Sequence, residues 1–275
     1  MERPGDVKPN FPVDAFAGTA AYYLRFRLPY PDDLVQDLVL RARLSGRGRL
    51  VDLASGPGPV AFALRSQFAA IWAVDLEPEM IEAGRREAAR LGASNITWLV
   101  GRVEDFAGPP GPAELVTIGE AFHRLEQGRT VANAFAWLRP GGCLATLGTF
   151  SALSGREAWQ RIVVQVVHRW TSGKRRTSDG QPLRKPEGSL EHNERVLRES
   201  GFTEVATHRF PRVHVWSLED IVGYLYSTSA ASRSLLGKDV DAFEVDLRAA
   251  LLAHDSSGTY QEDPQWSYTF GRKPL

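Results

Sequence analysis

The stretch Leu50–Val60, LVDLASGPGPV, decides the fold. Residues 49–54 (RLVDLA) form a short apolar run, which predicts a buried strand, and residues 60–68 (VAFALRSQF) predict a helix. The turn between them carries Gly56 and Gly58, followed by Ala61, in the spacing G-x-G-x-x-A. Glycine lets the backbone come close to a ligand because it has no side chain. The stretch therefore predicts a strand–turn–helix unit with a turn suited to ligand binding.

The same alternation of strand and helix continues along the chain to Phe150. We predict strands over residues 70–76, 95–101, 113–122 and 143–150, and helices over 77–92 and 128–142. Strands that alternate with helices indicate a mostly parallel sheet covered on both faces. Beyond Phe150 we expect helices over 155–170, 189–202, 217–237 and 239–254, a strand within 203–216 and an edge hairpin over 258–273.

These elements predict an α/β fold, a Rossmann-like, doubly wound, seven-stranded and mostly parallel sheet with an α-helical cap. We expect the last hairpin to supply an antiparallel strand. The expected divisions are an N-terminal helical arm over 1–45, a ligand-binding core over 46–150, a cap insertion over 151–200, and the last core strands with inserted cap helices over 201–275.

Composition restricts the partners. The 275 residues include 33 basic and 33 acidic ones, so no net charge favours nucleic acid or an anionic membrane, and a small molecule is the expected partner. The only cysteine, Cys143, cannot form an internal disulfide, which indicates a reducing compartment. Residues 1–18 are polar and contain no apolar signal segment, and no apolar run is long enough to span a membrane. We therefore expect a cytoplasmic protein, monomeric or homodimeric.

The glycine turn fits two kinds of cofactor. Asp75 follows Gly56 by about 20 residues at the end of the next strand, as in dinucleotide-binding proteins. Pro57 and Pro59, however, remove backbone N–H donors that a pyrophosphate would need. Asp52, inside the first strand, can neutralise an ammonium group or order the turn, and neither role favours a pyrophosphate. The turn therefore favours a cofactor without phosphate, although NAD(P) stays an alternative.

Five motifs in order resemble the class I S-adenosylmethionine-dependent methyltransferases: VDLASGPG, AVDLEPEMIEAGR, GRVEDF, TIGEAFHRLE and LRPGGCLAT. The resemblance covers roughly residues 18–150. YYLRFRLPYP near the N-terminus and VGYLYSTSAASRSLLG near the C-terminus are similar to the branch that acts on small molecules, which includes trans-aconitate and natural-product methyltransferases.

The resemblance implies a role for each matching position. S-adenosylmethionine would be the cofactor and S-adenosylhomocysteine its product. The residues implied to bind the cofactor are Tyr23, Arg27, Asp52, Ala54, Ser55, Gly56, Gly58, Asp75, Leu76, Met80, Val103, Glu104, Asp105, Glu120 and Ala121. Asp52 and the glycine turn would hold the methionine part, Asp75 the ribose hydroxyls, and Arg27 the cofactor's carboxylate.

Two positions depart from the family pattern. Ala54 replaces the first glycine of the turn, which is tolerable if φ at this residue stays negative. Arg102 stands where the third strand usually ends in an acidic residue, so recognition of the adenine has to shift to its neighbours.

The side that would face the methyl acceptor is less well defined. His123 follows the fourth strand at the carboxyl edge of the sheet and is the candidate general base, with packing beneath the cofactor as its alternative role. The candidate substrate-binding residues are Tyr22, His123, Trp159, Tyr224 and Ser227. The other histidines show no metal-ligand spacing, and we expect no metal site. Residues 174–185, with five basic side chains and one acidic, form either a solvated loop or a lid that attracts an acidic substrate.

The sequence thus predicts methyl transfer from S-adenosylmethionine to an oxygen, nitrogen or carbon atom of a small organic molecule, in natural-product metabolism. Two other functions stay open. One is an NAD(P)-dependent oxidoreductase that uses Gly56, Gly58 and Asp75. The other is a protein of methyltransferase fold that does not methylate and acts as a cyclase or as a binding partner.

Overall fold

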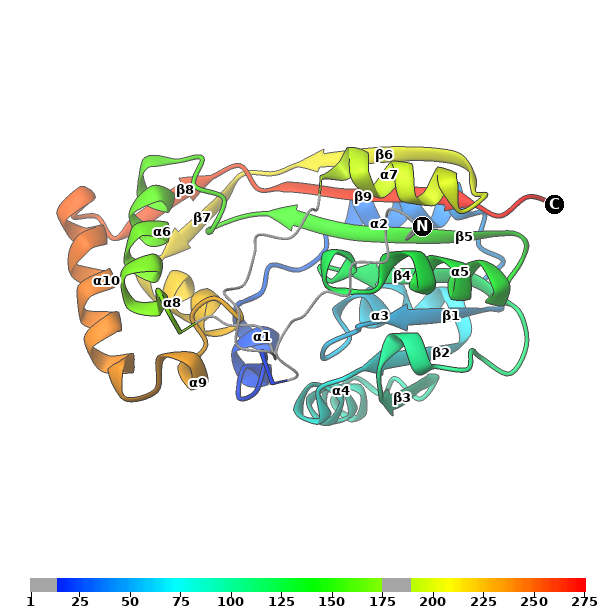
Figure 1. Cartoon of the computed structure of the whole chain (residues 1–275), viewed down its shortest axis with the longest axis horizontal. Helices are drawn as coiled ribbons and strands as arrows, with labels where there is room; N and C mark the ends of the chain where they lie inside the picture. Colours follow the sequence, from blue (N-terminus) through cyan, green and yellow to red (C-terminus); the bar gives the residue numbers. More distant parts are fainter. Residues whose placement is uncertain (1–13, 175–188) are drawn as a thin grey trace.

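A computed structural model of the chain describes residues 14–174 and 189–275. Its centre is a seven-stranded sheet with the order β3-β2-β1-β4-β5-β9-β6 (Figure 1). Every strand is parallel to β1 except β9, which runs antiparallel to both of its neighbours, β5 and β6. The strands are β1 (Gly48–Leu53), β2 (Phe68–Asp75), β3 (Ile96–Val100), β4 (Ala113–Gly119), β5 (Leu138–Phe150), β6 (Thr203–Pro211) and β9 (Gln265–Arg272). The predicted fold class is confirmed.

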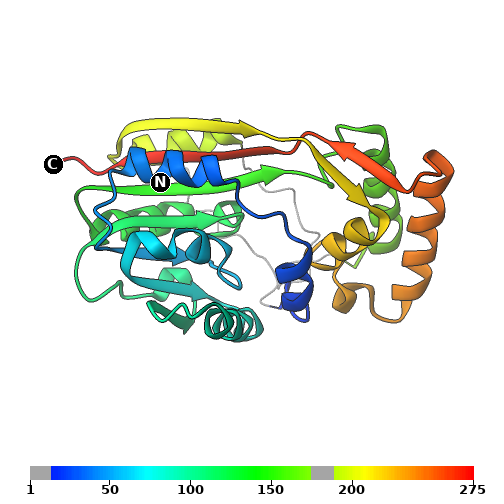
Figure 2. The same ribbon diagram turned by 180° about the vertical axis from the view of Figure 1, so that it is seen from behind.

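The two faces of the sheet are covered by different helices because successive side chains of a strand point to opposite sides. Leu50, Leu115 and Ala145 pack with α2 (Asp32–Ala42) and α3 (Pro59–Leu64), and α4 (Pro78–Leu91) extends this layer at β2 and β3. Val51, Val116 and Leu144 pack with α5 (Gln127–Trp137) and α7 (Leu190–Glu199). Figure 2 shows α2 lying across the first of these faces. The core therefore consists of two apolar layers on either side of the sheet.

The cap lies beyond one end of the sheet (Figure 1). It contains α6 (Ala158–Thr171), α8 (Leu218–Tyr226), α9 (Arg233–Leu236), α10 (Val240–His254) and a two-stranded sheet of β7 (His214–Ser217) and β8 (Thr259–Glu262). These helices share a separate apolar cluster around Val163, Leu225 and Phe243. In the described ranges no helix is long and apolar enough to cross a bilayer.

The structure corrects two expectations about the C-terminal half. The tail is not an edge hairpin, because β8 pairs with β7 in the cap while β9 lies inside the large sheet and leaves β6 at its edge. The residues of the expected cap insertion, 151–200, are also divided between the cap and the large sheet. Its first helix, α6, lies in the cap, but α7 packs on the sheet through Val196 and Leu197. In both cases apolar residues that the sequence assigned to a local unit are buried against a distant element.

The N-terminal helix connects the cap to the sheet. α1 (Ala20–Phe26) contacts α8 of the cap and α4 of the core. Gly223 in α8 lies against the ring of Phe26, with no room for a side chain at position 223. The expected arm is thus a helix at the boundary between core and cap, on the side where β1, β2 and β4 end (Figure 1).

Candidate functional site

The glycine turn leaves β1 with a left-handed backbone at three positions. Ala54 has φ +50°, Gly56 +55° and Gly58 +90°. The expectation of a negative φ at Ala54 is therefore wrong. The amide of the next residue, Ser55, donates to the carbonyl of Val74 in β2 at 3.0 Å. A left-handed alanine stores roughly 1 kcal/mol of strain, which marks the turn as a constrained segment.

Asp75, at the end of β2, holds the turn in place. Its Oδ2 accepts a hydrogen bond from the Gly56 amide at 2.7 Å and its Oδ1 accepts one from the Glu77 amide at 2.9 Å. Burial raises the pKa of this carboxyl group, and the two amides counteract the rise. Asp75 thus fixes the register between the ends of β1 and β2, next to the space in which the ribose of a cofactor is expected.

Asp52, in β1, is fully buried and only half satisfied. Its Oδ1 accepts a hydrogen bond from Thr117 Oγ1 at 2.8 Å, whereas Oδ2 has no hydrogen-bond partner within the described ranges. Burial raises the pKa of Asp52 to about 7, although the Thr117 hydroxyl and the nearby Ala61 amide act in the opposite direction. A buried oxygen without a donor costs about 1–3 kcal/mol, so this site fits a ligand that brings a donor or a positive charge.

Glu120 follows β4 immediately and carries the third carboxylate of this edge. Its φ of +56° is unusual for a residue other than glycine. Its Oε1 accepts a hydrogen bond from the amide of Thr149 in β5 at 2.5 Å. Burial raises the pKa of Glu120 to about 7, against the lowering effect of Arg27, the Thr149 amide and Arg124. The strained backbone and the bond to β5 together aim this side chain at the carboxyl edge of the sheet.

Arg27, after α1, brings a cation to the same place. Its guanidinium lies between the rings of Tyr23 and Tyr224, 4.8 and 4.9 Å from their centroids. Its Nε donates to Ser227 Oγ at 2.9 Å and its Nη2 to the Ser227 carbonyl at 3.3 Å. Ser227, expected at the substrate, therefore positions Arg27. The structure brings Tyr23, Arg27, Glu120 and Tyr224 into one electrostatic cluster.

His123 lies in the short 3₁₀ turn Phe122–Arg124 that follows β4. Burial and the neighbouring Arg124 lower the pKa of its imidazole to about 4. The ring is therefore neutral at pH 7 and able to accept a proton, but it is a weaker base than an exposed histidine.

Several other residues expected at the cofactor are occupied by contacts of their own. Met80 is buried in a small cluster with Ala20 and Ala83 beneath α1, and Val103 lies in the core. Glu104 Oε1 accepts a hydrogen bond from the Glu126 amide at 3.2 Å, and Asp105 forms an ion pair with Arg129 at 3.3 Å. The less constrained positions are Leu76, which is 36% exposed, the half-buried Ala121, and Ser55, whose hydroxyl donates to the carbonyl of Gly56.

Of the candidate substrate-binding residues, some lie near Arg27 and others are held in contacts of the cap. Tyr224 belongs to the cluster around Arg27, and Tyr22 packs edge-on against Tyr226 of the cap. Trp159 is buried in the cap core, where its Nε1 donates to the carbonyl of Gln261 at 3.0 Å. Most of the basic loop 174–185 lies outside the described residues, as does its proposed role as a lid. The parts of the chain that are described contain no group of metal-ligating side chains.

One further residue, beside the cluster around Arg27, has no role assigned from the sequence. Tyr30 ends the pattern Y-x-x-x-R-x-x-Y-P that begins at Tyr23, and its hydroxyl lies against Gly119, just before Glu120. Burial and the nearby Glu120 raise the pKa of this phenol well above its ordinary value. The spacing of this pattern places all three side chains on one short segment of the sequence.

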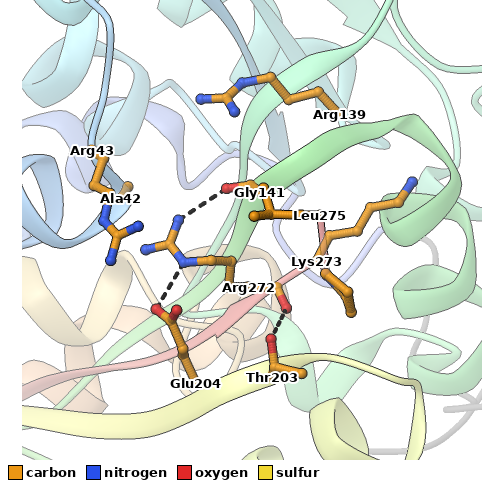
Figure 3. A pocket seen from close by; sticks show the side chains of 10 residues that line it. Ala42, Arg43, Arg139, Gly141, Thr203, Glu204, Arg272, Lys273 and Leu275 are labelled. Atoms are coloured by element: carbon orange, nitrogen blue, oxygen red, sulfur yellow. Dashed lines mark hydrogen bonds and ion pairs between the residues drawn. The ribbon is translucent and has the colours of Figure 1, made fainter.

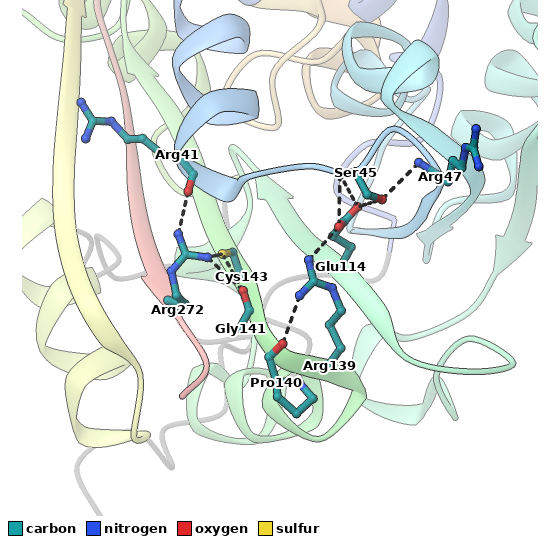
Figure 4. Close-up of polar contacts among 9 residues, drawn as sticks. All are labelled: Arg41, Ser45, Arg47, Glu114, Arg139, Pro140, Gly141, Cys143 and Arg272. Atoms are coloured by element: carbon teal, nitrogen blue, oxygen red, sulfur yellow. Dashed lines mark hydrogen bonds and ion pairs between the residues drawn. The ribbon is translucent and has the colours of Figure 1, made fainter. Parts of the chain in front are cut away.

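A pocket in the described part lies at the opposite end of the sheet, where the parallel strands begin (Figure 3). Its lining includes Arg43, Glu204 and Lys273, together with Arg272, whose Nε donates to Glu204. Beside it, Glu114 accepts hydrogen bonds from Ser45 and Arg139, and Arg272 donates to the carbonyls of Arg41 and Gly141 (Figure 4). These bonds tie strand ends and loops together, so this edge stabilises the sheet and is distinct from the carboxylate edge.

Comparison with known proteins agrees with this geometry. Residues 50–142 match the family model "Methyltransferase domain". The chain is 27% identical over 172 residues to a "Methyltransferase" of Claviceps purpurea, covering 60% of this chain and 53% of that protein. It is 30% identical over 139 residues to the "Ubiquinone biosynthesis O-methyltransferase" of Xylella fastidiosa, covering 47% of this chain and 56% of that protein. The matched region thus spans little more than half the length of these relatives.

The fold also matches solved structures. The YcgJ protein of Bacillus subtilis superimposes with a TM-score of 0.56 at 14% identity, over 89% of this chain and 100% of that chain. At this identity the likeness concerns the fold alone. The family match covers the strands that carry Asp52, Asp75 and the glycine turn, and it identifies residues 50–142 as a domain of the class I S-adenosylmethionine-dependent methyltransferase type.

Proposed function

We propose that this protein transfers the methyl group of S-adenosylmethionine to an oxygen, nitrogen or carbon atom of a small organic molecule in natural-product metabolism. The observation that carries the proposal is the charge at the carboxyl edge of the sheet. Asp52, Asp75 and Glu120 gather there, and burial raises the pKa of all three. Arg27 supplies a positive charge within this cluster. A cationic ligand relieves this imbalance, because it favours the charged form of each carboxyl group.

The residues present fit S-adenosylmethionine better than a dinucleotide. Its ammonium group suits the unpaired oxygen of Asp52, and its carboxylate suits the guanidinium of Arg27. Asp75 lies at the end of β2. In related folds an acidic side chain at this position accepts hydrogen bonds from the ribose hydroxyl groups. Leu76, Val103 and Ala121 would border the adenine and the methionine part. A pyrophosphate would add negative charge to a site that already holds three carboxyl groups.

When bound, the cofactor supplies an electrophilic methyl group on a sulfonium. The chain contributes the surroundings of that group. The rings of Tyr23 and Tyr224 lie on either side of Arg27, and Ser227 orients the guanidinium. The acceptor would enter between the sheet edge and the cap, beside His123. Such enclosure aligns the reactants and strengthens the electrostatic interactions inside the site.

His123 is the proposed contact to the acceptor. A base is most effective when its pKa lies near the working pH, and burial holds the pKa of His123 near 4 in the empty protein. We therefore expect His123→Ala to lower kcat by less than about tenfold. A loss of about 10²-fold or more, as expected for a missing general base, would instead assign proton removal to this ring.

Binding measurements test the proposal directly. Thermal unfolding and calorimetry with S-adenosylmethionine, S-adenosylhomocysteine and NADH should show stabilisation by the first two only, because a ligand that binds the native state raises its stability. Stabilisation by NADH alone would establish the oxidoreductase alternative. Transfer of a labelled methyl group should then be measured across phenols, carboxylic acids and amines. Tight binding with no transfer to any of these classes would favour a protein that does not methylate.

A further inference from the structure

The carboxylate of Glu120 has a setting that a purely structural side chain does not require. It follows β4 at the carboxyl edge, and its backbone is held at φ +56°. Its own amide donates to the carbonyl of Leu147 at 2.8 Å, and its Oε1 accepts from the Thr149 amide, so that two bonds to β5 fix both ends of the residue. A non-glycine residue adopts this conformation at a cost of roughly 1 kcal/mol, and such strain gathers at ligand-binding positions.

Two cations and three phenols surround Glu120. Arg27 faces it from the end of α1 and Arg124 from the turn after β4, while the phenols of Tyr23, Tyr30 and Tyr224 surround it from α1, the segment before α2, and α8. Arg27 is also bonded to Ser227, and Arg124 to Ser229. Burial outweighs both cations, since the pKa of Glu120 still rises to about 7. A cationic ligand beside it would favour the ionised form of this carboxylate.

We propose that Glu120 is the counter-charge of the sulfonium and makes the site distinguish the charged methyl donor from its neutral product. The inference rests on the proposed function. In methyl transfer the acceptor atom would form a bond to the methyl carbon while the carbon–sulfur bond breaks, its electron pair would stay on sulfur, and the positive charge on sulfur would disappear. The ammonium and carboxylate groups are common to donor and product, so Asp52 and Arg27 act on both alike. Glu120 alone would act on the charge that changes.

This arrangement has a consequence for turnover. A carboxylate favours the sulfonium and gains nothing from the thioether, so the product is held less tightly than the donor and is exchanged for it. The preference depends on the ionised form of Glu120. It is therefore expected to grow as the pH rises through about 7, which is where the empty protein releases this proton.

The test is the ratio of two dissociation constants, measured by calorimetry for S-adenosylmethionine and S-adenosylhomocysteine. In Glu120→Gln the affinity for S-adenosylmethionine should fall at least about tenfold more than that for S-adenosylhomocysteine, a difference of about 1.4 kcal/mol. Glu120→Asp, which keeps the charge, should retain most of the preference. An equal loss of both affinities would show that Glu120 holds the shared amino-acid part, and two unchanged affinities would show that it faces neither compound; both results overturn the inference.

Glu114→Gln is the matched control. Glu114 is a buried carboxylate near the start of β4, at the opposite edge of the sheet from Glu120, where it accepts hydrogen bonds from Ser45 and Arg139 (Figure 4). Its loss should lower stability without changing the ratio. Wild-type protein supplies a second measurement that requires no variant, since its preference for the donor should increase between pH 6 and pH 8, and a constant preference would contradict the inference. If neither compound binds the wild-type protein, the proposed function itself fails, and this outcome is distinct from a constant ratio.

Discussion

The hydroxyl group of Tyr30 occupies the space in which a side chain of residue 119 would lie. A Cβ atom on Gly119 would be 2.6 Å from Tyr30 Oη and 2.9 Å from Val60 Cγ2. Tyr30 comes from the segment between α1 and α2 and packs on Trp266 of β9 at 5.1 Å between ring centroids. Gly119 is the last residue of β4. The contact therefore fixes the N-terminal segment against the strand end that carries Glu120.

Gly119→Ala should disturb this contact. We expect the free energy of unfolding to fall by about 1–3 kcal/mol, as for other overpacked positions, and the affinity for S-adenosylhomocysteine to fall with it. Tyr30→Phe removes the obstructing hydroxyl, so in the Gly119→Ala background it should recover part of the lost stability. Denaturant unfolding of the two single variants and the double variant measures this coupling. Strictly additive effects would mean that the contact carries no energy.

Ala54→Gly addresses the strained turn. Glycine removes the penalty of the left-handed conformation. It also adds conformational freedom to the unfolded chain, which lowers the free energy of unfolding by about 0.4–1 kcal/mol. We expect a net gain of about 0.5 kcal/mol in the free energy of unfolding and a change in cofactor affinity within about threefold, or roughly 0.7 kcal/mol. Ala54→Val should destabilise, because a β-branched residue tolerates positive φ poorly. A destabilised glycine variant would show that the alanine methyl group is needed for packing.

The sequence predicts most of the core because its signals are local. The apolar runs around Leu50 and Leu115, and the glycine that ends the helix at residue 92, each depend on neighbours within one turn or one strand. The failures are non-local. Whether residues 265–272 pair with 259–262 or enter the large sheet is decided by β5 and β6, which are distant in the chain. No local pattern of the tail distinguishes the two pairings.

The same distinction between local and non-local signals applies to the candidate site. Asp52 and Asp75 could be assigned because the strand–turn–helix unit brings them to one edge. The conformation of Ala54 could not, because no local pattern distinguishes a left-handed alanine from one with ordinary strand geometry. The contacts of Ser227 with Arg27 join residues 200 positions apart. Such contacts arise from the packing of the cap on α1, which the sequence does not encode in any short motif.

Arg27 and Arg25 offer a matched pair on one helix end. Arg27 lies between two tyrosine rings and bonds Ser227, whereas Arg25 is 69% exposed and pairs with Glu219 at the surface. Lysine cannot reproduce the planar, forked guanidinium. We expect Arg27→Lys to weaken S-adenosylhomocysteine binding about tenfold, or 1.4 kcal/mol, and Arg25→Lys to leave it within twofold. Equal effects in calorimetric titrations of the two variants would remove Arg27 from the cofactor site.

Glu262 is the polar centre of the cap. Its buried carboxylate accepts hydrogen bonds from Ser151 Oγ at 2.5 Å, from Trp216 Nε1 at 2.8 Å and from Gln160 Nε2. In Glu262→Gln an amide group replaces one oxygen and places its N–H donors against other donors. We expect the free energy of unfolding to fall by about 1–3 kcal/mol. Asp263→Asn, at an exposed neighbouring residue, should change it by less than about 0.5 kcal/mol. Equal stabilities in urea would show that the three donors find other acceptors.

The raised pKa of Glu120 predicts how the stability of the ligand-free protein depends on pH. In the folded protein this carboxyl keeps its proton to about pH 7, whereas in the unfolded chain it loses the proton near its ordinary value of 4.5. Between these values the folded state binds more protons, so the contribution of Glu120 to the free energy of unfolding falls as the pH rises. Glutamine does not titrate. The stability of Glu120→Gln relative to the wild type should therefore increase by about 1–3 kcal/mol from pH 5 to pH 8. Urea unfolding of both proteins at several pH values measures this difference, and a difference that stays constant with pH would mean that Glu120 is already ionised in the empty site.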